Sequence, residues 1–224
     1  MSKKKKKKKE AKLEVKSEVK KEQKDRSVLY FYLLCALFAA LAAIFSQVMF
    51  PLPFTPVPIN LALLAVWLCG GVLGAKRGAI SIMVYILLGA MGVPVFHGFM
   101  GGLGVLAGPT GGYIAGYLPA VVIFGFLYNK YINVNNSNNS NNSNNDKNYH
   151  QKPVIRILLT IIIGLPALAA CYMVGTVWFI VTTGTNFLAA MMMCVVPFIP
   201  GDILKFVLAA AIMETLRKRG IIRQ

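Results

Sequence analysis

The chain has 224 residues, 56% of them hydrophobic, and a mean hydropathy of +0.60. A soluble globular domain is about 45–50% apolar, so this composition argues against a soluble protein and favours a polytopic helical membrane protein. The net charge of +16 does not indicate a nucleic-acid partner, because thirteen of the 24 lysines and arginines lie within the first 26 residues.

Residues 1–27 form a basic segment that opens with seven consecutive lysines. We expect a disordered cytoplasmic tail that sets the orientation of the protein and is attracted to anionic lipid headgroups. Its glutamates also recur every fourth residue among the lysines, a spacing that supports a solvated helix through i,i+4 pairs. They are Glu10, Glu14, Glu18 and Glu22. No small-residue cleavage site follows the first apolar run, so a signal peptide is not expected.

Apolar stretches predict an all-α integral membrane protein with six transmembrane helices in a domain over residues 28–216. One span needs about 20 mostly apolar residues, so the second, third and sixth stretches are short, and tilt or ordered loops would have to supplement them. The six stretches cover residues 28–49, 59–73, 78–93, 113–131, 154–181 and 202–216. An asparagine- and serine-rich tract at 133–152 interrupts the domain and predicts a flexible cytoplasmic linker.

Basic residues outside the tail fall on one side of this topology. The exterior loops at 50–58, 94–112 and 182–186 contain no lysine or arginine. Following the positive-inside rule, we expect both termini, including the basic segment 217–224, to be cytoplasmic in a multi-pass cell-membrane protein. Lys205 is the one basic residue that this topology places outside that pattern.

Two exterior segments are predicted to be ordered loops that cap a ligand cavity. Residues 51–58 contain four prolines, which exclude a helix and favour an extended cap. Residues 92–112 are rich in glycine, which lets backbone approach a ligand or another helix closely; a tightly packed turn is the alternative. The glycines at 101–112 lack the following Lys-Ser or Lys-Thr of a phosphate-binding loop. Active transport would therefore need an ion gradient or partner subunits.

Cysteines and histidines give no sign of a metal, and no cofactor is expected. The cysteines stand singly in apolar segments, which indicates small buried hydrophobic side chains rather than disulfides or ligands. They are Cys35, Cys69, Cys171 and Cys194. His97 lies in the glycine-rich loop without a second ligand nearby, and His150 lies in the polar linker.

Small residues recur four apart in the first predicted span, as the pairs Ala36–Ala40 and Ala39–Ala43. Such a stripe lets another helix pack closely in lipid, where packing drives association. The pattern alone fits a partner protein and internal packing about equally well.

Asp202 and Lys205 are the only charged residues deep within the apolar stretches. Three residues apart, they share one helix face, and charges in a membrane tend to line cavities and mark substrate paths. Asp202 follows Pro200-Gly201, which predicts the N-cap of the last helix, with Lys205 at its third position. The alternative is purely structural: Asp202 caps the helix while Lys205 neutralises it or extends outward. As a site, Asp202 would accept hydrogen bonds from a ligand N–H and Lys205 would donate to a ligand oxygen.

Four motifs in order resemble the BioY family, the biotin-specific substrate-binding (S) components of energy-coupling-factor transporters. They are Pro-Val-Pro-Ile at 56–59, Gly-Ala-Met-Gly-Val-Pro-Val-Phe at 89–96, Gly-Pro-Thr-Gly-Gly-Tyr at 108–113 and Pro-Phe-Ile-Pro-Gly-Asp-Ile-Leu-Lys at 197–205. The resemblance covers residues 30–216 apart from the asparagine tract. It implies a six-helix protein that binds biotin near its outer face, driven by a transmembrane coupling subunit and two ATPase subunits.

The resemblance also implies roles for particular residues. Asp202 would take a ureido N–H of biotin, and Lys205 would meet the ureido oxygen or the carboxylate. Aromatic contacts to the apolar ring would come from Phe96 and Tyr113, with Phe54 a weaker candidate, and Asn60 would add a polar contact. The small residues of the first helix would pack against the coupling subunit, which assigns Ala36, Ala40, Ala39 and Ala43 to partner binding.

Ala62 departs from the family pattern, because members often carry glutamine at this position; Asn60 would then substitute for it. Three alternatives remain open: an S-component for another vitamin, a stand-alone ion-coupled biotin carrier, and an intramembrane enzyme using Asp202 as acid or base. The enzyme has little support, since no metal ligands and no nucleophile–base pair accompany the carboxylate.

Overall fold

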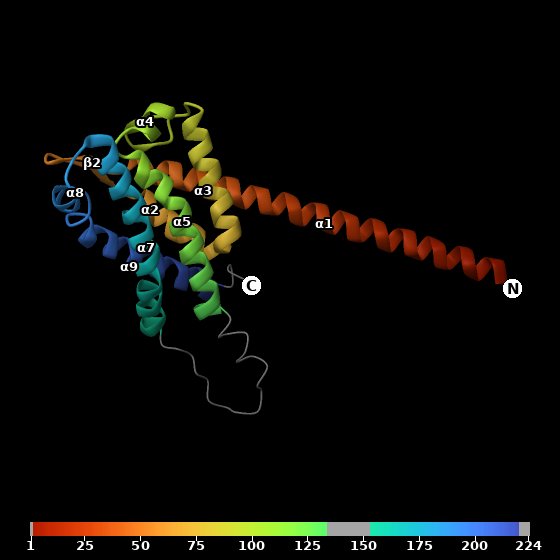
Figure 1. The fold of residues 1–224 in the computed structure, drawn as a ribbon. Coiled ribbons are helices and arrows are strands. Elements are labelled where there is room, and N and C mark those ends of the chain that lie inside the picture. Colours follow the sequence, from red (N-terminus) through yellow and green to blue (C-terminus); the bar gives the residue numbers. More distant parts are fainter. Residues whose placement is uncertain (1, 134–152, 220–224) are drawn as a thin grey trace.

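The computed structural model describes residues 2–133 and 153–219, and their elements are mostly helices (Figure 1). In chain order they are α1 (Ser2–Gln47), β1 (Met49–Leu52), β2 (Thr55–Asn60), α2 (Ala62–Leu68), the π-helical turn η1 (Cys69–Leu73), α3 (Gly74–Ala90), the 3-10 turn η2 (His97–Phe99), α4 (Leu103–Ala107), α5 (Gly111–Tyr128), the π-helical turn η3 (Asn129–Asn133), α7 (Pro153–Thr183), α8 (Phe187–Cys194) and α9 (Ile199–Lys218).

Helix α1 is 46 residues long, and its N-terminal part projects far from the other helices (Figure 1). Its apolar part, Val28–Gln47, is long enough to span a membrane. The tail, for which the sequence analysis gave a disordered segment and also a solvated helix, is helical from Ser2 onward. The i,i+4 spacing of opposite charges explains the helix, and Arg26 and Glu22 form such a pair at 2.9 Å.

The proline-rich segment after α1 is extended, as predicted, and forms a two-stranded antiparallel hairpin. Phe50 in β1 pairs with Ile59 in β2, and an irregularity in register follows between Phe50 and Leu52. Proline lacks the N–H that a central strand would donate, so prolines fit a short ribbon with two free edges.

Helices α2 and α3 form one apolar stretch in sequence but run in opposite directions. Gly74 begins α3 with a φ of +79°, in the left-handed region that favours glycine. A Cβ on Gly78 would lie only 2.9 Å from the Cys69 carbonyl oxygen. On one straight helix, Cys69 and Gly78 would be about 13 Å apart along the axis, because they are nine residues apart. Their close approach therefore shows that the chain turns back at Gly74.

Within residues 2–133 and 153–219, four helical stretches are long and apolar enough to cross a membrane. A fifth is obtained if α8 and α9, which meet at a 46° bend, are taken as one broken span. The four are Val28–Gln47, Ala62–Ala90, Gly111–Ile132 and Val154–Thr183. The structure therefore supports a multi-pass helical membrane protein. Six transmembrane spans remain a prediction. That number requires the stretch Ala62–Ala90, which reverses at Gly74, to provide two spans.

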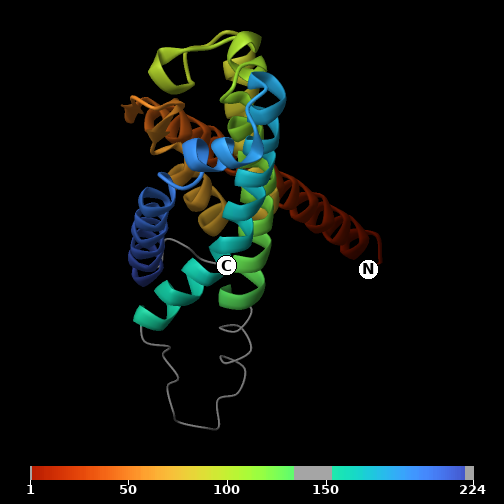
Figure 2. The same ribbon diagram turned by 60° about the vertical axis from the view of Figure 1, so that its left-hand side comes forward.

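The core lies where α2 packs against α5 and α9, while α5 and α7 run side by side (Figures 1 and 2). Trp67 of α2 is fully buried, stacks on Phe206 at 4.3 Å between ring centroids and meets Phe124 edge-on at 5.3 Å. In lipid, packing rather than removal from water drives helix association, so close ring contacts of this kind hold helices together. These contacts hold α9 at Phe206 beside α2 and α5.

Helix α8 has no counterpart in the sequence analysis, which assigned no element to residues 187–201. Asn186 caps it, because its side chain accepts a hydrogen bond of 2.8 Å from the backbone N–H of Ala189. Cys194, the last residue of α8, meets Thr55 of the β1–β2 hairpin at 3.9 Å, and α8 then bends into α9.

Apart from Lys205, the basic residues outside α1 that the structure describes gather at one end of the bundle. Arg156, near the start of α7, pairs with Glu214, near the end of α9, at 3.3 Å. The start of α3 packs against the last turn of α5, since a Cβ on Gly125 would lie 2.5 Å from the Ala75 nitrogen. The starts of α3 and α7 and the ends of α5 and α9 therefore lie together, opposite α4 (Figure 2).

Candidate functional site

A cavity lies between the α4-side ends of the helices and the first turns of α9. It holds about 520 Å³ of empty space, part of it open to solvent. Its walls come from β2, α2, η2, α5, α7, α8 and α9. The lining residues are Val57, Pro58, Asn60, Leu63, His97, Thr110, Tyr113, Ile114, Tyr117, Cys171, Tyr172, Cys194, Phe198, Asp202 and Lys205.

Asp202 lies in the first turn of α9 but does not cap the helix, so the N-cap prediction was wrong. Helix α9 begins at Ile199, with Phe198 as its N-cap and Pro200 in its first turn. Proline is favoured there because its φ suits a helix and its missing N–H costs nothing. The Asp202 N–H already donates to the Phe198 carbonyl at 2.9 Å, and its side chain faces the cavity.

Lys205 and Asp202 form an ion pair inside the cavity wall. Lysine Nζ lies 2.7 Å from Asp202 Oδ1, and the side chains are 6% and 3% exposed. The pair lies on one helix face, as predicted, and Lys205 does not extend outward. Within residues 2–133 and 153–219, the ammonium makes no other hydrogen bond, which leaves two of its three protons for a ligand.

Tyr172 of α7 is a site residue that the sequence analysis missed. Its hydroxyl donates a hydrogen bond to the second carboxylate oxygen, Asp202 Oδ2. The carboxylate is thus held by Lys205 on one oxygen and by Tyr172 on the other, which fixes its orientation. A tyrosine within an apolar helix resembles ordinary core in a sequence, so no local signal marked it.

Tyr113 of α5 lines the cavity, as the sequence analysis expected. Its hydroxyl and that of Thr176 form a hydrogen bond of 3.1 Å. Gly175 gives the ring its space, because a Cβ at this position would lie 2.2 Å from Tyr113 Cδ1. With its hydroxyl engaged by α7, the tyrosine offers the cavity an aromatic surface.

Asn60 also lines the cavity, at the end of β2. Its Oδ1 accepts a hydrogen bond of 3.1 Å from the Ala62 N–H as α2 begins. The side-chain oxygen of Asn60 is therefore engaged by the backbone of α2, and its NH₂ group is the part that can donate a hydrogen bond. Tyr117 of α5 lies close enough to interact with the Asn60 side chain.

Phe96 does not line the cavity, contrary to the role expected for it. The ring is fully buried and packs edge-on against Tyr85 at 5.5 Å between centroids. It lies over Gly89 of α3, where a Cβ would be 2.1 Å from Phe96 Cζ. Phe54, the weaker candidate, is exposed and also lies outside the lining residues.

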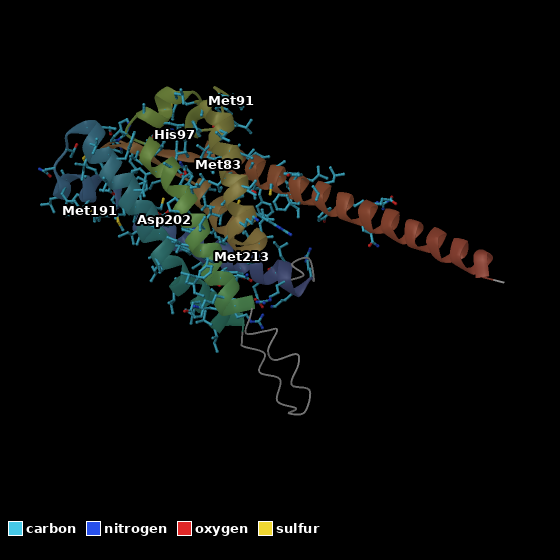
Figure 3. The ribbon with its side chains drawn as sticks, turned by 45° about the vertical axis from the view of Figure 1, so that its right-hand side comes forward. Met83, Met91, His97, Met191, Asp202 and Met213 are labelled. Atoms are coloured by element: carbon cyan, nitrogen blue, oxygen red, sulfur yellow. The ribbon has the colours of Figure 1, made fainter. Side chains whose placement is uncertain are left out.

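His97, adjacent to Phe96, lines the cavity instead. Its Nε2 lies 3.3 Å from Thr110 Oγ1, another lining residue. Burial lowers the pKa of the His97 imidazole below its ordinary value of 6.5, because the charged form loses hydration. Figure 3 shows His97 toward the α4 end of the molecule and Asp202 farther along the bundle.

The alanines of α1 divide between two faces. Ala36 and Ala40 are exposed, whereas Ala39 is buried and Ala43 packs against the core. The pair Ala39–Ala43 thus serves internal packing, and the pair Ala36–Ala40 remains open to a partner.

The four cysteines are free and buried, as predicted, and two of them, Cys171 and Cys194, line the cavity. In the part of the chain that the structure describes, no group of three or more His, Cys, Asp or Glu side chains is arranged to hold a metal ion.

Comparison with known proteins gives a consistent family assignment. The model of the BioY family matches residues 15–221. A probable biotin transporter BioY from Pyrococcus horikoshii is 35% identical over 184 residues, which cover 82% of this chain and 94% of that protein. The biotin transporter BioY of Rhizobium etli is 33% identical over 178 residues, covering 79% and 87%.

A solved structure shares the fold. The crystal structure of the S-component for biotin from an ECF-type ABC transporter superposes with a TM-score of 0.70 at 27% sequence identity. The match covers 86% of this chain and 93% of that one.

Proposed function

This chain belongs to the BioY family, and on that basis we propose that it is the biotin-binding S-component of an ATP-driven vitamin uptake transporter. The family consists of transporter components rather than enzymes, so Asp202 acts as a binding group and not as a catalytic acid or base. The observation that carries the proposal is the buried Asp202–Lys205 pair in the cavity wall.

The cavity offers what each part of biotin requires. The ureido ring has two N–H donors and a carbonyl acceptor, while the thiophane ring is apolar. We assign a ureido N–H to the Asp202 carboxylate, which Lys205 and Tyr172 hold in place. The aromatic face of Tyr113 is assigned to the apolar ring, and the NH₂ group of Asn60 to an acceptor oxygen of the ligand.

Geometry favours the ureido oxygen as the partner of Lys205. Its Nζ and Asp202 Oδ1 are 2.7 Å apart, so the two side chains meet the same end of an extended ligand. In the ureido group an N–H and the carbonyl oxygen are attached to neighbouring atoms, whereas the carboxylate lies at the far end of the valerate chain. A carboxylate placed beside Asp202 would also meet a like charge.

The energy for uptake is proposed to come from partner subunits. The relative of similar fold is a component of an ECF-type ABC transporter, and we extend that assembly to this chain as a transmembrane coupling subunit with two ATPase subunits. Ala36 and Ala40, exposed on the apolar part of α1, are the small-residue surface assigned to the coupling subunit.

The proposed topology has six spans and two cytoplasmic termini. The reversal at Gly74 separates the second span from the third, and α9 provides the sixth. The end of the bundle that carries Lys76, Arg77 and Arg156 is assigned to the cytoplasm by the positive-inside rule. The cavity then opens toward the exterior.

The test is retention of labelled biotin by the purified chain, in competition with unlabelled biotin, thiamine and riboflavin. The proposal requires that biotin alone displaces the label. Retention of labelled thiamine or riboflavin, with no retention of biotin, would assign the chain to another vitamin.

Co-purification of this chain from native membranes tests whether coupling and ATPase subunits accompany it. Ion-dependent uptake by this chain alone, without ATPase subunits, would identify a stand-alone carrier instead.

A further inference from the structure

Gln47, the last residue of α1, makes two hydrogen bonds to the loop that carries His97. Its Nε2 donates to the Phe96 carbonyl at 3.0 Å, and its Oε1 accepts from the Phe99 N–H at 2.8 Å. The same Nε2 also lies 3.3 Å from the Ala43 carbonyl of its own helix. One amide group thus joins the outer end of α1 to both sides of His97.

The loop has a reason to need this support. Phe99 has a φ of +56°, a left-handed conformation that non-glycine residues rarely adopt. Its side chain is 73% exposed, so packing does not hold it there. Strained backbone of this kind persists only where surrounding contacts fix it. Two hydrogen bonds from Gln47 and the bridge between Phe96 and Met100 fix this turn.

The position of His97 depends on this turn. Phe96 is anchored beneath it over Gly89, and Phe99 is held after it by Gln47. Between these two fixed points the imidazole reaches Thr110 at the cavity wall. Gln47 itself does not line the cavity, so any effect on a ligand must pass through the turn.

We propose that Gln47 is a positioning residue that holds the 96–100 turn closed and keeps His97 at the ligand cavity. This inference rests on the proposed function, because the ligand whose release the turn controls is taken to be biotin. Loss of the two hydrogen bonds leaves the fold of α1 in place and frees the turn to open, so that bound biotin escapes faster.

The test compares Gln47→Met, which keeps side-chain length and removes both hydrogen bonds, with Gln23→Met, the same change at an exposed position of the same helix. Two measurements are made on the full chain: the rate of biotin dissociation and amide hydrogen exchange over residues 96–100. We expect Gln47→Met to speed dissociation about three- to ten-fold, the size of one or two ordinary hydrogen bonds, and to speed exchange at Phe99. Gln23→Met should change neither.

The double variant separates positioning from general stability. If Gln47 acts through His97, then Gln47→Met should add no further loss in a His97→Ala background. An equal additional loss in that background would overturn the proposal, as would unchanged dissociation in Gln47→Met alone or in His97→Ala alone. If the unaltered chain binds no biotin, the proposed function fails. Hydrogen exchange then still decides on Gln47, because unchanged exchange at Phe99 would contradict its role.

Discussion

The Lys205 ammonium lies 2.7 Å from a carboxylate oxygen of Asp202, and both side chains are nearly inaccessible to solvent. Removing two charges from water is costly and is repaid only by close pairing and further hydrogen bonds. The Tyr172 hydroxyl supplies one such bond. A buried ion pair often contributes little net stability, so stability alone does not explain why this one is present. Its position in the cavity wall points instead to ligand binding.

Replacing Asp202 by asparagine should weaken biotin binding by about 30-fold or more. The variant loses the charged acceptor for a ureido N–H and leaves Lys205 buried without its counter-ion. Isothermal titration with biotin measures the affinity, and thermal unfolding of the ligand-free protein should show a lowered midpoint. Unchanged affinity in this variant would remove Asp202 from the site.

The double variant Asp202→Asn with Lys205→Met should recover much of the stability lost by the single change, but not the binding. Neutral or apolar groups in place of a buried ion pair are often tolerated, whereas breaking one partner costs about 3–5 kcal/mol. Stability is measured as the unfolding midpoint of each ligand-free variant, compared with that of the unaltered chain. A double variant that unfolds like the single one, or that binds biotin like the unaltered chain, would contradict this account.

Tyr172→Phe should weaken binding about ten-fold, because the Asp202 carboxylate loses the hydrogen bond that orients it. The matched control is Tyr32→Phe on the exposed face of α1, which should bind normally. Titration of both variants decides the point. Equal affinities for the two would show that the orientation of the carboxylate does not depend on Tyr172.

Gly175→Ala should reduce biotin affinity by displacing the Tyr113 ring, since the added Cβ would lie 2.2 Å from Tyr113 Cδ1. Overpacking of this kind typically costs about 1–3 kcal/mol. Gly104→Ala in α4, where a Cβ meets nothing within 4 Å, is the control for the same substitution. If Gly175→Ala binds biotin as well as the control, Tyr113 does not shape the site.

Stability of the ligand-free protein should fall as the pH is lowered below about 6.5, with His97 as one cause. The pKa of His97 is lowered in the folded state from its ordinary value of 6.5, so in this range the unfolded chain binds more protons than the native one. That contribution to stability is complete above the unfolded-state pKa and is lost as pH falls through the folded pKa. Unfolding midpoints between pH 7 and 5 measure the effect, and His97→Gln should flatten the decline. An identical decline in that variant would assign it to other groups.

The sequence was informative where physical chemistry makes a residue unusual. Charges in apolar helices are rare, so Asp202 and Lys205 were identifiable without coordinates. Their positions on α9 were not, because Pro200 extends the helix back to Ile199 and moves Asp202 out of the N-cap. Asn60 and Tyr113, for which the family resemblance implies ligand contacts, line the cavity, and their roles in binding remain predictions.

The site features that the sequence did not predict depend on tertiary packing. Phe96 and His97 are neighbours in an irregular loop, and only the space over Gly89 determines that the phenylalanine points into the core and the histidine toward the cavity. Tyr172 and Thr110 lie on other elements, and no spacing in the sequence links them to Asp202 or His97. The alternation of Ala36 and Ala39 between an exposed and a buried face likewise depends on how α1 packs.

The most direct test of the central claim is an equilibrium titration of the purified full chain with biotin, alongside Asp202→Asn. We predict saturable binding of one biotin per chain that the substitution weakens by about 30-fold or more. Absence of saturable biotin binding by a folded preparation of the unaltered chain would contradict the account.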